Sequence, residues 1–209
     1  MPLPSNSLFS DMLLASHNSF SYLHPRHWWM RPFFWMARCQ KVDIAAQELL
    51  GVRMYDLRVR FDRHKKPIIC HGLMEYEAIN LDSWLELMNR TYDHYMRVVL
   101  ETTRPDQKQE IEFILFCGTL EHKYPNIKFF GGNNRTDWSC QNPIYDFKQK
   151  LPQIDHKYSS TTTLFPNAPA WLTRIDDLYP YLYARLHNKQ NYANPTPNRW
   201  LMLDFVNLC

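Results

Sequence analysis

The sequence predicts an α/β fold in which repeated βα units form a single barrel-shaped domain. Short apolar runs alternate with longer amphipathic stretches along most of the chain, which is the pattern of such units. The chain has 209 residues, of which 45% are hydrophobic, so it can bury a substantial core. Several ionisable residues stand at or near the ends of the apolar runs, where a β/α barrel carries its reactive groups. We therefore expect one domain over residues 1–209.

Six short apolar runs have the length and the residue types of strands. They cover residues 11–17, 52–59, 67–71, 96–102, 127–131 and 199–206. Successive side chains of a strand point to opposite faces, so Met54, Asp56 and Arg58 share one face of the second strand. Tyr55 and Leu57 share the other face. If the apolar face packs under helices, the carboxylate and the guanidinium point into the barrel.

The helices are predicted from their ends as well as from their apolar spacing. Asp43 is placed to cap the first helix, and Gly51 supplies its C-terminal stop. Pro105 suits the first position of the third helix, because the N–H that proline lacks is not needed there. Residues 132–173 are rich in Asn, Pro and Thr and show little periodicity, so we expect loops there. The predicted helices cover residues 44–50, about 81–94 and about 105–118, with a fourth after Asp176 and Asp177.

The overall charge and the glycine and cysteine content exclude some functions. A formal net charge of +3 and a pI of about 8.5 are too weakly basic to indicate a nucleic-acid partner, but they suit an anionic membrane surface or a phosphate substrate. Only 5 glycines are present, which argues against a glycine-rich nucleotide loop. The 5 cysteines are widely spaced without a Cys-x-x-Cys pair, so the sequence indicates neither a zinc site nor a disulfide framework.

The N-terminal residues carry neither the basic start nor the apolar centre of a signal peptide. No stretch of the sequence approaches the ~18 consecutive apolar residues of a membrane-spanning helix. We therefore expect a monomeric cytoplasmic protein that acts peripherally at membranes, or a secreted one if an export signal has been removed.

Two histidines, His17 and His71, are the strongest candidates for chemistry. A phosphodiester is cleaved when one imidazole takes a proton from the attacking hydroxyl and a second imidazole gives a proton to the leaving oxygen. Histidine can take either part near neutral pH, and a carboxylate such as Asp204 can orient one of them as the base. Arg58 has the donor geometry for a phosphate, and Asp56 on the same face could hold it or assist the acid. The alternative is a scatter of buried polar residues, since the chain has 9 histidines, but the order and shared face favour metal-free phosphodiester cleavage.

Four segments that contain these residues resemble the X domain of phosphatidylinositol-specific phospholipase C, and the bacterial, metal-independent type is the most similar. The segments span residues 12–206, with the weakest similarity in the middle third. They are Leu-Leu-Ala-Ser-His17-Asn-Ser-Phe, Asp43-Ile-Ala-Ala-Gln-Glu-Leu-Leu-Gly51-Val-Arg-Met-Tyr-Asp56-Leu-Arg58, Ile-Ile-Cys-His71-Gly72 and Leu-Met-Leu-Asp204-Phe.

The resemblance implies a distorted, irregular TIM barrel and a defined role for each residue. His17 would be the general base on the inositol 2-hydroxyl, and His71 would be the general acid towards the diacylglycerol oxygen. Arg58 would clamp the phosphate, and Asp204 would support His17. The products would be an inositol 1,2-cyclic phosphate and diacylglycerol, so the resemblance implies a phospholipase C with a phospholipid substrate.

Two departures from the bacterial pattern bear on the mechanism. Asn18 follows the first histidine where the bacterial type has Asp, and the calcium-dependent eukaryotic type uses an Asn there as a metal ligand. Arg58, however, stands where the calcium type has an acidic residue, and a guanidinium cannot be deprotonated to admit the metal. We therefore expect no metal cofactor, and we count Asn18 among the candidate catalytic residues. The chain also ends at Cys209, where the family has a closing helix, which leaves the identity of the substrate open.

The segment after the first predicted strand is dense in aromatic and basic residues. It reads His-Pro-Arg-His-Trp-Trp-Met-Arg-Pro-Phe-Phe-Trp-Met over residues 24–36. Such mixtures anchor proteins at lipid headgroups, so we expect Trp28 and Trp29 to be exposed residues of a membrane interface. The alternative is that the aromatic rings cover the barrel. His24 and His27 have the spacing of metal ligands, but a solvated loop is the simpler interpretation.

Glu101 and Arg104 close the fourth predicted strand and are candidate substrate-binding residues. Helix capping by Thr103 is the alternative interpretation of part of this motif.

Two rival functions stay open at the level of the sequence. A metal-dependent glycerophosphodiester phosphodiesterase or sphingomyelinase-D-like enzyme needs an acidic pair after the second strand, where Asp56-Leu57-Arg58 offers one carboxylate. A catalytically weak lipid-binding module is compatible with Asn18 and with the length of the chain. Such a module would bind vesicles without releasing a headgroup.

Overall fold

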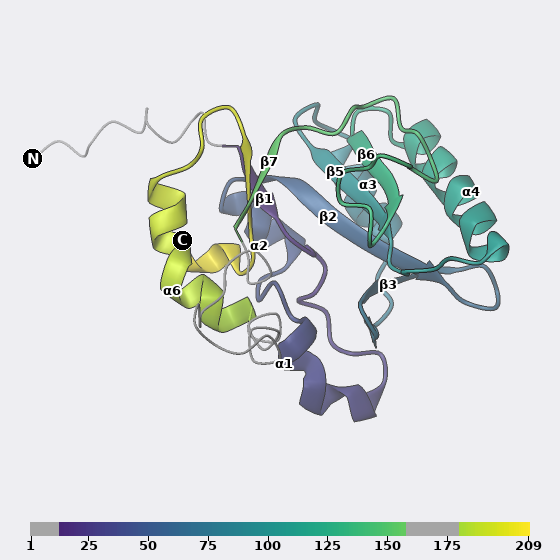
Figure 1. Ribbon diagram of the computed structural model, residues 1–209, viewed down its shortest axis with the longest axis horizontal. Helices are drawn as coiled ribbons and strands as arrows, with labels where there is room; N and C mark the ends of the chain where they lie inside the picture. The colour runs from purple at the N-terminus through teal and green to yellow at the C-terminus, as the bar shows by residue number, and fades with distance from the viewer. Residues whose placement is uncertain (1–12, 158–179) are drawn as a thin grey trace, which may run out of the picture.

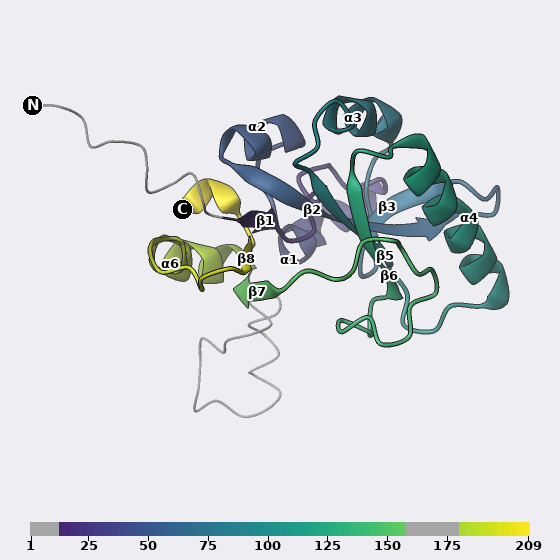
Figure 2. The same cartoon turned by 90° about the horizontal axis from the view of Figure 1, so that it is seen from above.

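The computed structural model describes residues 13–157 and 180–209. Within these residues the chain forms a mixed α/β structure around one sheet of eight strands. Six of the strands are parallel and form an open barrel, which Figures 1 and 2 show from two directions. In order across the sheet, the parallel strands are β6 (Lys128–Asn134), β5 (Tyr95–Leu100), β2 (Val52–Phe61), β1 (Leu14–Ser16), β8 (Trp200–Leu203) and β7 (Ile154–Lys157).

The barrel is open between its two outermost parallel strands. β6 and β7 do not pair with each other in the part of the chain that the structure describes. The predicted irregular TIM barrel is confirmed, and five of the six predicted strands lie in its parallel part.

The sixth predicted strand, residues 67–71, forms but does not run parallel. β3 (Pro67–His71) turns back antiparallel along β2, and β4 (Met74–Glu75) pairs antiparallel with β3. The turn over 62–66 is too short for the crossover of about a dozen residues that a parallel neighbour needs. His71 therefore reaches the site from the tip of a hairpin, and not from the carboxyl end of a barrel strand as we predicted.

Helix α2 (Ile44–Leu49) begins as predicted and ends one residue before the predicted residue 50. The carboxylate of its N-cap, Asp43, accepts a hydrogen bond of 2.9 Å from the backbone N–H of Ala46. α3 (Leu81–Met88) ends before the predicted residue 94, because the chain has to turn and enter β5 at Tyr95.

Helix α4 (Gln107–Lys123) differs from the predicted range of 105–118 at both ends. Asp106 is its N-cap, and its carboxylate accepts a 2.7 Å hydrogen bond from the backbone N–H three residues further on. Pro105 therefore lies before the helix and not at its first position. The C-terminal end continues because the buried apolar stripe of the helix extends to Leu120.

The C-terminal part of the molecule departs most from the prediction. α6 (Pro180–Ala193) is helical, but Asp176 and Asp177, predicted to begin this helix, lie outside the described residues. β7 falls within 132–173, where we predicted loops. Its sequence, Ile-Asp-His-Lys, has one apolar side chain, so its hydrophobic pattern gives no strand signal. Shorter helical segments are η2 (Trp28–Phe33), α1 (Phe34–Ala37) and η5 (Val206–Leu208).

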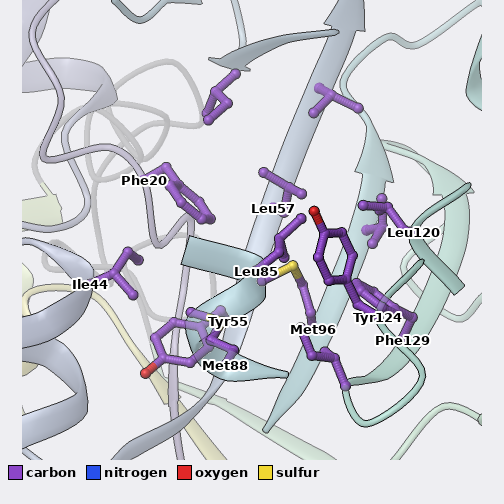
Figure 3. Close-up of a cluster of buried hydrophobic side chains, with 14 of the residues drawn as sticks. Phe20, Ile44, Tyr55, Leu57, Leu85, Met88, Met96, Leu120, Tyr124 and Phe129 are labelled. Atoms are coloured by element: carbon purple, nitrogen blue, oxygen red, sulfur yellow. The ribbon is translucent and has the colours of Figure 1, made fainter. Parts of the chain in front are cut away.

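The two faces of β2 pack into different layers. On the outer face, Tyr55 and Leu57 belong to the main apolar cluster beneath the helices, which Figure 3 shows together with Leu85 of α3 and Leu120 of α4. On the inner face, Met54 belongs to a smaller apolar group inside the barrel, with Ala15, Phe130, Trp200 and Met202. None of the described helices is both long and apolar enough to cross a membrane.

Candidate active site

Polar residues that directly follow β1 and β8 meet a polar residue from the middle of β2 inside the barrel. The last residue of β1, Ser16, pairs in register with β2 on one side and with β8 on the other. The residues that follow the paired positions are His17, Asp56 and Asp204, so they lie next to one another across three neighbouring strands. All three are buried, at 6%, 0% and 1% exposure. The barrel thus brings together residues that are far apart in the sequence.

His17 is held between a carboxylate and a guanidinium. Its Nδ1 lies 2.7 Å from Oδ1 of Asp204, and its Nε2 lies 2.7 Å from Nη2 of Arg58. A guanidinium can only donate, so Nε2 accepts this hydrogen bond and Nδ1 carries the ring hydrogen, which it donates to Asp204. The imidazole is therefore neutral, with the lone pair of Nε2 directed into the site. This is the tautomer that a general base needs.

Arg58 is at the centre of a buried network of charges. Its Nε donates to Oδ2 of Asp56 at 2.8 Å, and its Nη1 lies 3.4 Å from Oε2 of Glu101. Nη1 of Arg97 lies 3.8 Å from the other oxygen of Asp56. Burial raises the pKa of Asp56, but the charges of Arg58 and Arg97 outweigh it and hold that pKa below its ordinary range. The carboxylate is therefore ionised and fixes the guanidinium in place.

His71, at the end of β3, faces His17 across the site. The ring centroids are 6.0 Å apart and the planes nearly perpendicular, at 85°. Nδ1 of His71 donates to the carbonyl oxygen of Ala37 at 3.0 Å, which leaves Nε2 as the nitrogen that exchanges a proton. Burial, followed by the charge of Arg58, lowers the pKa of His71 to about 4. In the free protein this imidazole is therefore neutral at neutral pH.

Glu101 joins this cluster, whereas Arg104 does not. Glu101 is 2% exposed, and its Oε1 accepts a 2.8 Å hydrogen bond from the backbone N–H of Gly72, directly after the second histidine. Arg104 is exposed, and no hydrogen bond or ion pair among the described residues joins it to the site. Arg135 lies there instead, with its Nε 3.7 Å from Glu101. The sequence reasoning therefore identified the carboxylate of this motif but not the neighbouring arginine.

Asn18 lies in the cluster in an unusual backbone conformation. Its φ of +44° is in the left-handed region, and its backbone N–H donates to Oδ2 of Asp56 at 3.0 Å. The side-chain amide is buried beside Cys39 and Tyr76, and neither of its polar atoms makes a hydrogen bond of good geometry to a described residue. The amide thus has donor and acceptor capacity to spare for a substrate.

Three residues in the barrel were missed by the sequence analysis. The ring of Trp138 lies over the guanidinium of Arg97 at 3.9 Å and over that of Arg58 at 5.2 Å. It also contacts the rings of His17 and, from β7, His156. Arg97 stands opposite Asp56 in the β2–β5 register, so strand alternation could have identified it. Trp138 and His156 lie in the stretch predicted as loops and gave no such signal.

The segment predicted to meet membranes forms η2 and α1 at one edge of the molecule, where α1 is labelled in Figure 1. Trp28 and Trp29 are 75% and 53% exposed. Phe33 and Trp35 are also about half exposed, whereas Phe34 packs against the core. His27 stacks on Trp29 with centroids 4.4 Å apart.

Two solved structures with a similar fold are named as phosphatidylinositol-specific phospholipases C. The structure of a phosphatidylinositol-specific phospholipase C from Listeria monocytogenes aligns over 93% of this chain and 88% of its own, with a TM-score of 0.60 at 13% identity. A mutant of the enzyme of this name from Staphylococcus aureus aligns over 93% of this chain and 85% of its own, with a TM-score of 0.53 at 12% identity. At this level of identity the similarity shows a shared fold. No protein-family model matches the sequence, and neither does any curated protein.

Proposed function

We propose that this protein is a phospholipase C that cleaves phosphatidylinositol-type lipids without a metal, giving an inositol cyclic phosphate and diacylglycerol. The observation that carries the proposal is the setting of His17, with Asp204 at one ring nitrogen and Arg58 at the other, each at 2.7 Å. The fold shared with phosphatidylinositol-specific phospholipases C supports the same assignment.

In the proposed first step, Nε2 of His17 takes the proton of the inositol 2-hydroxyl while that oxygen attacks phosphorus. Asp204 stabilises the resulting imidazolium through its hydrogen bond to Nδ1. Arg58 leaves Nε2 when the substrate binds and donates instead to the phosphoryl oxygens, on which charge develops in the transition state. The same guanidinium thus covers the base in the free protein and binds the phosphate in the complex.

His71 gives a proton to the diacylglycerol oxygen as the bond between phosphorus and that oxygen breaks. This step needs a protonated ring, whereas the pKa of His71 in the free protein is about 4. A bound phosphodiester brings negative charge to the ring and draws Arg58 away from it, and both changes raise that pKa. Glu101 already acts in the same direction in the free site. We therefore expect His71 to be protonated mainly in the substrate complex.

The proposal needs no divalent metal, because Arg58 occupies the position that a cation would take. The carboxylates of Asp56 and Glu101 lie 2.8 and 3.4 Å from its nitrogens. A calcium ion would need these oxygens together with that of Asn18, since it takes about 6–8 oxygen ligands. Such an ion would then lie in contact with a guanidinium that cannot lose its charge.

Exposed aromatic side chains of η2 and α1 support action at a bilayer. Rings at this level of exposure, with Arg31 among them, suit the lipid headgroup region. The surface adjoins the site, because the carbonyl of Ala37 at the end of α1 accepts the hydrogen bond of His71. A lipid held at this surface would have its phosphate close to the two histidines.

The test is headgroup release from phosphatidylinositol vesicles in EDTA, with wild type and His17→Ala side by side. The proposal predicts cyclic inositol phosphate from the wild type and a rate lower by about 10²–10⁴-fold in the variant. If neither protein releases headgroup in EDTA and Ca²⁺ or Mg²⁺ restores activity to the wild type, the result would favour a metal-dependent phosphodiesterase. Vesicle binding by both proteins without headgroup release under any of these conditions would favour the lipid-binding module.

A further inference from the structure

Cys39, in the segment between α1 and α2, lies among the side chains of the candidate site, although the proposed mechanism does not use it. The residue is 1% exposed, and its sulfur lies 4.0 Å from Nδ1 of His71. One ligand atom each from Cys39, His17 and Asp204 can be chosen so that all three lie within 4.8 Å of one another. Sulfur, imidazole nitrogen and carboxylate oxygen are the donors of zinc sites, and three of them with an open fourth position make a common arrangement.

Backbone contacts on several sides hold these ligands in place. The N–H of Cys39 donates to Oγ of Ser21 at 2.9 Å, and its carbonyl accepts a 2.6 Å hydrogen bond from the N–H of Phe205. The carbonyl of Asp204 accepts a 2.7 Å hydrogen bond from the side-chain amide of Asn188. The backbone is therefore fixed at two of the three ligands, which lowers the cost of ordering them around an ion.

The fully buried charges around the cluster favour a cation. Arg58 and Arg97 carry the positive charges, and Asp56, Glu101 and Asp204 carry the negative ones. These three carboxylates outnumber the two arginines. A divalent ion that displaces one thiol proton adds a single positive charge and so compensates the excess.

We propose that Zn²⁺ or Cd²⁺ binds Nδ1 of His17, Sγ of Cys39 and a carboxylate oxygen of Asp204, and thereby inhibits the protein. The thiol loses its proton to solvent, since the thiolate is the ligand. The hydrogen of Nδ1 moves to Nε2, because a neutral imidazole with a metal on one nitrogen carries its hydrogen on the other. Nε2 then has no lone pair with which to take a proton, and Arg58 keeps its bond to Asp56 while losing the one to His17. Inhibition follows from the loss of the general base.

The ligand set separates this effect from calcium dependence. Thiolate and imidazole select zinc and cadmium, whereas calcium prefers a shell of oxygen ligands. A protein with this site can therefore work in EDTA, ignore Ca²⁺ and still be inhibited by soft divalent ions.

The binding test is a titration of the intact protein with Cd²⁺, followed by the ultraviolet charge-transfer band of a cadmium thiolate. We compare the wild type with Cys39→Ser and with Cys209→Ser, a matched control that removes an exposed thiol outside the three-residue cluster. We expect Cys39→Ser to bind at least about 100-fold more weakly, because it loses a direct ligand where even a supporting group is worth 10–100-fold. Cys209→Ser should keep the band. A wild-type band no stronger than that of Cys39→Ser would overturn the proposal, once circular dichroism shows that the variant is folded.

A second experiment measures inhibition of headgroup release, and it rests on the proposed function. Zn²⁺ should lower headgroup release by the wild type, EDTA should restore it, and Ca²⁺ at the same concentration should have no effect. Unchanged activity at a Cd²⁺ concentration that saturates the band would overturn the inhibitory role. A protein that binds Cd²⁺ through Cys39 but cleaves no phospholipid would contradict the proposed function and leave the metal site standing, so the two failures are distinguishable.

Discussion

The two faces of β2 are about equally buried, but they carry different types of residue and make different contacts. On the outer face, Tyr55 and Leu57 are 0% exposed and pack against the apolar side chains of the helices. On the inner face, Asp56 and Arg58 are 0% and 5% exposed and bind other charged groups. The outer face stabilises the fold through apolar burial. The inner face has to offset the desolvation of each charge by pairing it, which contributes little net stability.

This difference shows that burial alone does not distinguish a core residue from a site residue. The groups that each side chain contacts distinguish them. Changes on the outer face should therefore alter the free energy of unfolding, and changes on the inner face should alter catalysis. The four predictions below test that division, from the largest expected effect to the smallest.

Arg58→Lys should lower kcat/KM by about 10²–10³-fold, because lysine lacks the planar donor fork that meets the phosphate. The melting temperature should change little, since the ammonium keeps a positive charge beside Asp56. Initial rates on phosphatidylinositol vesicles and a thermal scan measure the two quantities. Arg60→Lys, on the same strand but outside the cluster, is the matched control, and equal losses in both variants would break the comparison.

Leu57→Ala should lower the free energy of unfolding by about 2–5 kcal/mol, because it opens a cavity in the outer cluster. The rate per folded molecule should not change. Urea unfolding gives the stability, and Leu49→Ala, at a position that is 90% exposed, should be close to neutral. A loss of catalysis in Leu57→Ala without a loss of stability would contradict the division between the faces.

His156 of β7, which contacts Trp138 inside the barrel, should also affect stability, through pH. Burial, followed by the charge of Arg97, lowers its pKa to about 4 from the ordinary 6.5 of an unfolded chain. The unfolded state then binds a proton that the folded state does not, so stability is complete above about pH 6.5 and falls as the pH drops to about 4. Because the ring is partly exposed, we reduce the free energy that corresponds to this pKa shift. We expect the free energy of unfolding to fall by about 2 kcal/mol over this pH range. The urea midpoint should fall less steeply with decreasing pH in His156→Asn than in the wild type. If the two proteins show the same slope, burial of this histidine is not the cause of the pH dependence.

The smallest effect concerns the exposed aromatic segment, where apolar side chains stabilise no core. Trp28→Ala should weaken vesicle binding by about 1–2 kcal/mol, or roughly tenfold, because the ring no longer enters the headgroup layer. Cleavage of a short-chain soluble substrate should be unaffected. Vesicle sedimentation measures the affinity, with Tyr92→Ala as a control of similar exposure, 74% against 75%. Equal weakening by both variants would mean that η2 has no special contact with lipid.

Sequence patterns predicted the parts of the fold that depend on interactions between residues close together in the sequence. The alternation of Met54, Asp56 and Arg58 gave the inner face of β2, because each strand residue points opposite to its neighbour. Asp43 marked the start of α2, because its carboxylate satisfies an N–H of the first turn. The sequence could also suggest a cluster of His17, Asp56 and Asp204, since His17 and Asp204 directly follow clear strands and Asp56 lies within another.

Tertiary contacts decided the parts that the sequence did not reveal. β7 is polar because His156 points into a site and not into an apolar core, so it carries no hydrophobic signal. Trp138 reaches the two arginines from an irregular segment after β6. Arg135 replaced Arg104 beside Glu101 because the backbone path after β5 and β6 cannot be inferred from residue spacing alone.

The most direct test of the central claim follows the phosphorus of the substrate by ³¹P NMR in EDTA. Wild-type protein should convert phosphatidylinositol vesicles to a five-membered cyclic phosphodiester before any monoester forms. Asp204→Asn, which keeps the size of the side chain but not its charge, should slow that conversion by up to about 10⁴-fold. A monoester as the first product, or a conversion that needs added metal, would contradict the two-histidine account.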